Sequence, residues 1–191
     1  LFRQTSDRLM YVHMDSNRDV TPMVTAKDGK PLATNPLKDP RVRKAMSMAV
    51  NRPLIVERVM EGEAVPAGQL VPDFLFGATK NLRVEKHDPE GARKLLAEAG
   101  YPDGFALTLH ATNNRYVNDA KIAQALAQMW TRIGLKTEVV AMPSATTIAV
   151  APPITSTSGG VRSASMKRAS NPGIGLIRMT GCVPPASSAV C

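Results

Sequence analysis

The chain has 191 residues and a formal net charge of +8, with 43% hydrophobic and 21% charged residues. That length suits one domain, or one domain with a tail, and no membrane span is expected because no apolar run approaches the roughly 20 residues that cross a bilayer. Aromatic residues make up only 4% of the chain, which favours an α/β domain rich in alanine and leucine over a β-sandwich or barrel.

Half of the excess positive charge lies in the C-terminal part of the chain. No Asp or Glu follows Glu138, whereas four Lys or Arg residues do, and without those four the chain has 20 basic and 16 acidic residues. These are interspersed, unlike the basic stripe that neutralises nucleic-acid phosphates. We therefore expect no nucleic-acid partner, although a basic nucleic-acid-associated domain without catalytic activity stays open as the alternative function.

The two ends of the chain leave questions open. The chain begins at Leu1 without a signal-peptide layout, as expected where a segment is cut from a longer chain or a leader has been removed. Its cysteines, Cys182 and Cys191, both lie near the C-terminus. They are compatible with a disulfide in an oxidising compartment, and whether they pair is left open.

The first predicted elements are a strand at residues 9–14 and two helices after a long loop. Asp39-Pro40 places a capping carboxylate before a proline at the first helical position, which predicts a helix start. Apolar residues at helical spacing predict the buried face of this helix, formed by Val42, Ala45, Met46 and Ala49. A second short helix is expected after Asn51, with apolar positions at Leu54, Ile55, Val59 and Met60.

The same start signature returns at Asp88-Pro89 and opens a third helix, for which Gly100 suits the left-handed position after the C-terminus. Its expected core face consists of Ala92, Leu95, Leu96 and Ala99. Alternating apolar residues then predict a strand at 105–110, and an amphipathic pattern predicts a helix from about 118 to 133. The expected buried stripe of that helix consists of Ile122, Ala125, Leu126, Met129, Trp130 and Ile133.

A further strand is expected at 135–141, after Gly134. Strand, helix and strand joined by short loops indicate a βαβ unit with parallel strands, so the predicted fold class is α/β. From about Ser144 the pattern changes: Ser, Thr, Ala, Pro and Gly dominate, and no apolar face persists. Such a segment buries too little apolar surface to offset chain entropy. We therefore divide the chain into a folded part, 1–146, and a tail, 147–191, that is expected to be disordered or the product of a shifted reading frame.

The sequence contains no recognisable arrangement for catalysis or metal binding. His13, His87 and His110 are far apart and lack partners at metal-ligand spacing. P-loop, Gly-x-Ser-x-Gly and dinucleotide-binding motifs are absent. We therefore expect a protein that is not an enzyme and has no cofactor or metal; a small α/β enzyme is disfavoured.

One polar cluster, Asn113 to Asp119, follows a predicted strand and precedes a predicted helix. In open α/β sheets, ligands bind at that position. The guanidinium of Arg115 would bind a carboxylate there through two parallel hydrogen bonds, assisted by the amides of the helix N-terminus. The alternative, favoured on composition alone, is a solvated loop in which Arg115 is simply exposed.

Several segments resemble the peptide-type (oligopeptide, dipeptide and nickel) solute-binding proteins of ABC transporters, family 5. They include NPLKDPRVRKA at 35–45, GQLVP at 68–72, DPEGARKLLAEAGY at 88–101 and the stretch 130–143. The resemblance covers about residues 9–146. It implies part of a type II periplasmic-binding-protein-like fold, namely the second lobe, with a large first lobe expected before Leu1.

The resemblance also implies a periplasmic or lipid-tethered receptor that closes two lobes over a small peptide or other small solute and delivers it to ABC permease subunits. It carries over Arg115 as a clamp for the peptide's C-terminal carboxylate, with Asn114, Tyr116 and Asn118 as flanking ligand-binding candidates. After Thr146 the chain departs from the family, and the Gly/Asp-rich stretch that contacts the ligand's amino end is missing. No acidic partner for a ligand ammonium group is therefore named.

Overall fold

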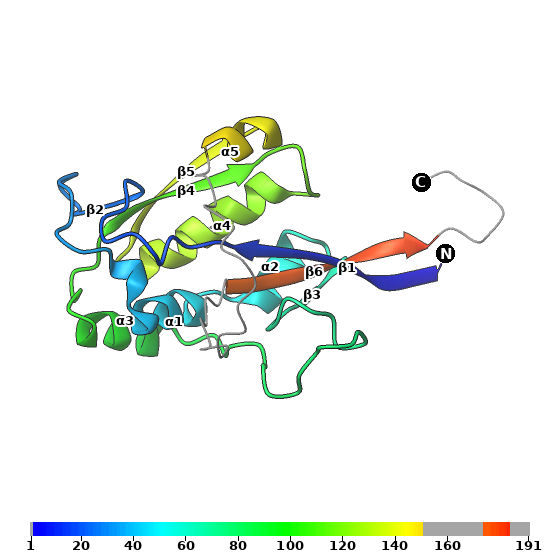
Figure 1. The fold of residues 1–191 in the computed structure, drawn as a ribbon. Coiled ribbons are helices and arrows are strands. Elements are labelled where there is room, and N and C mark those ends of the chain that lie inside the picture. The colour runs from blue at the N-terminus through cyan, green and yellow to red at the C-terminus, as the bar shows by residue number, and fades with distance from the viewer. Residues whose placement is uncertain (1, 151–173, 184–191) are drawn as a thin grey trace, which may run out of the picture.

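The computed structural model describes residues 2–150 and 174–183 (Figure 1). These residues form two three-stranded sheets, one ordered β1-β6-β3 and the other β2-β4-β5. The strands are β1 (Phe2–Val12), β2 (Val24–Thr25), β3 (Ala64–Pro66), β4 (Ala106–Thr112), β5 (Lys136–Met142) and β6 (Ile174–Val183). The helices are η1 (Pro36–Lys38), α1 (Pro40–Met48), α2 (Arg52–Arg58), α3 (Pro89–Glu98), α4 (Asp119–Arg132) and α5 (Ser144–Val150).

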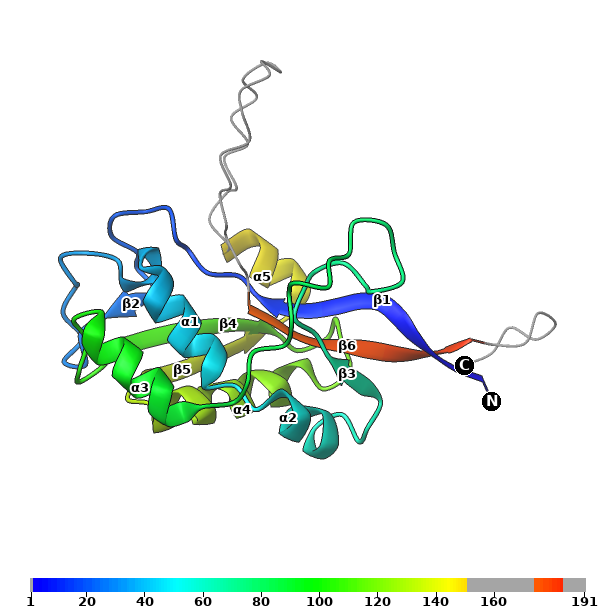
Figure 2. The ribbon, with the colours of Figure 1, turned by 90° about the horizontal axis from the view of Figure 1, so that it is seen from below.

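The predicted βαβ unit is confirmed. Strands β4 and β5 pair in parallel, from Ala106 opposite Lys136 to Thr112 opposite Met142, and α4 forms the crossover between them. Strand β2 adds to the other edge of β4 in antiparallel orientation. In Figure 1, α4 lies between this sheet and the layer formed by α1 and α3, and Figure 2 shows the same arrangement from below. The chain is therefore an α/β layer structure.

The predicted helix starts are also confirmed. The side chains of Asp39, Asn51 and Asp88 accept hydrogen bonds from main-chain amides in the first turns of α1, α2 and α3, and a proline stands at the first or second position of each helix. At the end of α3, Gly100 has a φ of +93°, and the amide of Tyr101 donates to the carbonyl of Leu96 at 2.8 Å. This is the Schellman arrangement, which satisfies carbonyls at a helix end.

The C-terminal carbonyls of α1 show how its neighbours hold it, because the last turn of a helix has no partners of its own. The carbonyl of Met46 accepts from Trp130 of α4 at 3.0 Å, and that of Met48 accepts from the amide of Asp88 at 2.9 Å. The carbonyl of Ser47 accepts from Arg52. Each of these donors comes from a different helix or helix start, so the end of α1 is a junction between α2, α3 and α4.

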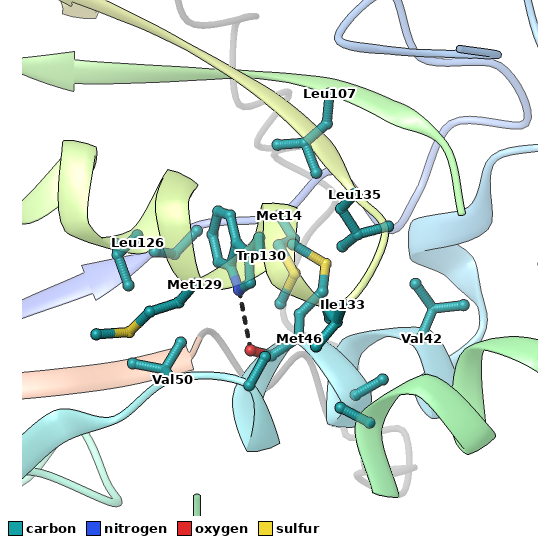
Figure 3. Close-up of a cluster of buried hydrophobic side chains, with 14 of the residues drawn as sticks. Met14, Val42, Met46, Val50, Leu107, Leu126, Met129, Trp130, Ile133 and Leu135 are labelled. Atoms are coloured by element: carbon teal, nitrogen blue, oxygen red, sulfur yellow. Dashed lines mark hydrogen bonds between the residues drawn. The ribbon is translucent and has the colours of Figure 1, made fainter. Parts of the chain in front are cut away.

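The core lies between α4, α1 and the β4–β5 strands (Figure 3). Its largest fully buried side chains include Trp130, Phe105 and Met46. All four predicted core positions of α1 are buried, as are the predicted positions of α4 except Ala125, which is partly exposed. Leu54 of α2 is 36% exposed. No described helix combines the length and the apolar character needed to cross a bilayer.

The structure also contains elements that the sequence pattern did not predict. Strand β1 begins at Phe2 instead of residue 9, because β6 pairs with both of its ends, from Phe2 to Thr5 and from Leu9 to Val12, with an irregularity between them. Helix α5 crosses the predicted boundary at 146, and β6 lies inside the predicted tail. The rest of that tail, 151–173 and 184–191, lies outside the described residues, so the division of the chain at 146 stays a prediction.

Candidate solute-binding site

The candidate site is the loop that joins β4 to α4, at the carboxyl end of β4 as the sequence predicted. Asp119, the first residue of α4, fixes its shape and is 6% exposed. One carboxylate oxygen, Oδ2, accepts hydrogen bonds from the hydroxyl of Thr112 at 2.7 Å and from the amides of Arg115 and Tyr116 at 3.1 and 3.3 Å. Asp119 therefore connects the end of β4, the loop and the helix start.

The charge of Asp119 is favoured by these contacts. Burial favours the neutral carboxyl group, but the hydrogen bonds from Thr112, Arg115 and Tyr116 outweigh it, and the pKa of Asp119 lies below its ordinary value. Asp119 was part of the predicted cluster but had no predicted role. The signal that could have indicated this role is an acidic residue at a helix start, directly after a short polar loop.

Arg115 and Tyr116 are brought together. Arg115 is exposed; its Nε donates to the Tyr116 hydroxyl at 3.1 Å, and its guanidinium carbon lies 5.4 Å from the centre of the Tyr116 ring. The pKa of Arg115 lies above its ordinary value, chiefly because of the hydrogen bond to Tyr116, with a smaller effect of Tyr11 in β1. Tyr116 packs against the core, so one half-buried ring orients the exposed guanidinium.

Arg115 has no internal carboxylate partner among the residues whose side chains are described, 8–147. No Asp or Glu in that range forms an ion pair with it, whereas Arg41 pairs with Asp39 and Arg93 with Glu90. Among the described residues, the side chain of Arg115 makes one hydrogen bond, and this bond uses Nε. The two terminal nitrogens of the guanidinium therefore remain available for a ligand. The fork that binds carboxylates is thus held in place and is accessible.

The other two candidates have structural partners. The side-chain oxygen of Asn114 accepts from the amide of Ser144 at 2.9 Å, at the start of α5. The side-chain nitrogen of Asn118 donates to the carbonyl of Val59 at 2.8 Å, and Asn118 has the left-handed φ of 58°. Asn114 therefore anchors the loop to α5 and Asn118 anchors it to the end of α2. Their role in ligand binding stays a prediction.

A shallow pocket of about 410 Å³ lies elsewhere and includes none of these residues. It is lined by Asp19, Ala33, Thr34, Asn35, Lys38, Asp39, Ala99 and Tyr101. Lys38 there pairs with Asp19, and Asp39 pairs with Arg41, so its charges are matched internally. We place the candidate site at Arg115 because the guanidinium there lacks such a partner. The described residues include no cluster of three or more His, Cys, Asp or Glu side chains that could hold a metal ion.

Comparison with known proteins finds solute-binding proteins that resemble this chain. The glutathione-binding protein GsiB of Escherichia coli strain K12 is 38% identical over 107 residues, which are 56% of this chain and 20% of GsiB. The structure of AgaA from A. tumefaciens R10 with agropinic acid has a TM-score of 0.55 and 32% identity, covering 60% of this chain and 24% of AgaA. The structure of a dipeptide-binding protein from Pseudoalteromonas sp. SM9913 with Met-Leu has a TM-score of 0.53 and 27% identity. The match covers 66% of this chain and 25% of that protein.

The chain thus spans about a fifth of the length of the curated relatives it matches, such as GsiB at 20%. The model of the bacterial extracellular solute-binding proteins, family 5 (middle region), matches residues 3–172, which is most of the chain. That family consists of binding proteins and not of enzymes. The α/β layers, the βαβ unit and this match agree, and the chain belongs to family 5 of the bacterial extracellular solute-binding proteins.

Proposed function

We propose that this chain is part of a periplasmic receptor that binds a small solute carrying a carboxylate, such as a short peptide, and delivers it to the permease of an ABC transporter. Family membership supports the receptor role. The names of similar proteins support the solute class, because glutathione, agropinic acid and Met-Leu all carry an acidic group.

The observation that carries the proposal is the arrangement of Arg115. Asp119 fixes the loop, Tyr116 orients the guanidinium, and the terminal nitrogens face no described carboxylate. A preorganised donor pair binds a carboxylate at a lower entropic cost than a mobile one does. A bidentate Arg–carboxylate contact is also among the stronger hydrogen-bonded pairs. We therefore assign the solute's carboxylate to Arg115.

This site forms one wall of a binding cleft. Ligand sites of this size usually bury most of the ligand surface, whereas the β4–α4 loop contacts only one side of it. We expect weak binding by this chain alone, with dissociation constants on the order of 1 mM, near the affinity of a few good contacts. Selectivity for the carboxylate should persist at this affinity, because it depends on Arg115 alone.

The experiment is isothermal titration calorimetry with Met-Leu, glutathione and the C-terminal amide of Met-Leu. Arg115→Ala removes the fork, and Arg132→Ala is the matched control, because it removes one exposed arginine at the opposite end of α4. We expect the two free acids to bind and the amide to bind at least about tenfold more weakly, which corresponds to 1.4 kcal/mol. Arg115→Ala should abolish this preference, and Arg132→Ala should keep it. Equal binding of acid and amide by the natural chain would contradict the proposal.

The nucleic-acid alternative gains no support from the described surface. Basic side chains there stand beside acidic ones, as in the pairs of Arg18 with Asp15, Lys30 with Asp28 and Arg58 with Glu57. Such alternation weakens the continuous positive potential that phosphate binding needs.

A further inference from the structure

Strand β6 occupies an interior position in its sheet. It pairs antiparallel with β1 on one side and with β3 on the other. At the centre, Ile177 lies opposite Met10 and Pro66, and Arg178 lies opposite Leu9 and Val65. The backbone of these two residues is therefore paired on both sides, whereas β1 and β3 each have β6 as their one partner among the described strands.

Without β6, the edges of β1 and β3 would face each other across a gap one strand wide. Both edges belong to the region that matches the family, residues 3–172, whereas β6 begins at Ile174 and lies outside it. Unpaired strand edges recruit further strands, because their amides and carbonyls lack partners. The β1 and β3 edges together thus form what we call the acceptor slot.

The sequence of β6 is that of an effective strand donor. Among residues 174–183 there is one charged residue, Arg178, no acidic residue and no proline, and isoleucine, leucine, methionine and valine make up half of the segment. Segments with β-branched residues, low charge and no proline pair readily with exposed strand edges. The pairing that holds β6 is between backbones, so it does not depend on which chain supplies the strand.

The connection between β6 and the preceding helix is long. Residues 151–173, which are 23 in number, separate Val150 from Ile174. At about 3.3 Å per residue, a connection of this length spans up to roughly 75 Å. It therefore permits β6 to enter the acceptor slot of its own chain or that of a neighbour.

We propose that the acceptor slot of β1 and β3 takes β6 from a second copy of this chain, giving a reciprocal strand-exchanged dimer. Exchange of identical elements preserves every backbone pair and closes with twofold symmetry. The effective concentration of a linked segment is on the order of 1 mM. The exchanged dimer therefore becomes populated as the chain concentration approaches that value, and the monomer with its own β6 predominates far below it.

The test uses the register of β1 and β6, in which Arg3 lies opposite Cys182. Two full-length chains each carry half of a cross-strand cysteine pair. The first has Arg3→Cys together with Cys182→Ser and Cys191→Ser; the second has only Cys191→Ser and carries a size tag. The chains are unfolded, mixed and refolded at about 10 µM, far below the effective concentration, and at about 1 mM, close to it. They are then oxidised and separated without reductant.

The matched control replaces Arg3→Cys with Gln4→Cys, which lies opposite Gly181 and on the other face of the strand. A second control keeps Arg3→Cys and Cys182 in one chain. We expect a disulfide between the two different chains at about 1 mM, at least about tenfold more abundant than with Gln4→Cys, because disulfide geometry is specific.

Three results would overturn the proposal. In the first, the single-chain control forms its internal disulfide, but the mixed chains form none at the higher concentration. In the second, the Gln4→Cys control crosslinks as well as Arg3→Cys does, which would show random collision. In the third, the single-chain control forms no disulfide, which would show that β6 does not lie beside β1.

Discussion

The indole nitrogen of Trp130 donates a hydrogen bond of 3.0 Å to the main-chain carbonyl of Met46 (Figure 3). Trp130 is fully buried in α4, and Met46 lies in the last turn of α1, where a helix leaves carbonyls without partners. One side chain thus fills the core and completes the end of another helix. The layer of α1 and α3 is thereby joined to the βαβ unit that carries the candidate site.

Trp130→Phe should destabilise the chain by about 1–3 kcal/mol, because the Met46 carbonyl would remain buried without its donor. Trp130→Ala should cost about 3–5 kcal/mol, since it also leaves a cavity. Urea unfolding followed by circular dichroism measures both. Wild-type stability of Trp130→Phe, within about 0.5 kcal/mol, would mean that the hydrogen bond contributes little.

Gly104 and Gly134 approach each other where α4 ends and β5 begins. Gly104 has a φ of +74°, and a Cβ there would stand 2.2 Å from the carbonyl oxygen of Gly134. Gly134 has a φ of +99°, but its Cβ would meet its nearest atom, the Asp103 carbonyl oxygen, at 3.6 Å. Gly104→Ala should therefore cost roughly 1–3 kcal/mol more than Gly134→Ala, because it adds a backbone clash to the left-handed strain.

Gly29→Ala is the control for strain alone, because Gly29 has a φ of +87° and no atom within 4 Å of its Cβ position. We expect a loss of about 1 kcal/mol there, from the left-handed conformation. Thermal unfolding ranks the three variants. If Gly104→Ala and Gly29→Ala lose the same amount of stability, the backbone near Gly134 moves aside without cost.

The contribution of Asp119 to stability should depend on pH. Its pKa is depressed below the ordinary value of 3.8 in the folded chain, so its charge stabilises the fold above that value, and this contribution is lost as the pH falls through the folded pKa. Asp119→Ala should lose about 1–3 kcal/mol at pH 7. The difference in the free energy of unfolding between Asp119→Ala and the wild type should shrink below about pH 4. Urea unfolding from pH 7 to pH 3 measures it, and a difference that grows on acidification would contradict the assignment.

Asn118 combines a left-handed backbone with a hydrogen bond to Val59. Asn118→Gly keeps the backbone conformation accessible but loses the hydrogen bond, whereas Asn118→Ala loses both. We expect wild type to be the most stable, Asn118→Gly to lose about 1 kcal/mol and Asn118→Ala to lose about 1–2 kcal/mol more. Hydrogen exchange at the end of α2 should rise in both variants. If Asn118→Ala is as stable as Asn118→Gly, the left-handed backbone at position 118 does not strain an alanine there.

The sequence predicted those elements whose signals are local. Asp39-Pro40 and Asp88-Pro89 mark helix starts within a few residues, and the stripe around Trp130 repeats within one helix. Strand β6 and the first half of β1 were not predicted, because each depends on the other across the whole chain: Phe2 pairs with Val183. A pattern of Gly, Ser and Pro around residues 174–183 concealed a strand that long-range pairing stabilises.

The candidate site follows the same division. The position of Arg115 after a strand and before a helix was predictable, because both elements have strong local patterns. The partners of Asn114 and Asn118 were not, since Ser144 and Val59 lie 30 and 59 residues away in sequence. Asp119 organises the loop through residues within seven positions of itself; its place at a helix start after a polar loop was a usable signal, but the residues that donate to it could not be read from residue type alone.

The most direct test of the carboxylate site is a titration of the isotope-labelled chain with Met-Leu and with its C-terminal amide, followed by nuclear magnetic resonance. The amide signals of Arg115 and Tyr116, and the Arg115 Nε signal, report on the loop that Asp119 holds. We predict that these signals shift with the free acid and stay in place with the amide. Equal shifts with both compounds, or shifts confined to the pocket around Asn35 and Tyr101, would contradict the assignment of the site to Arg115.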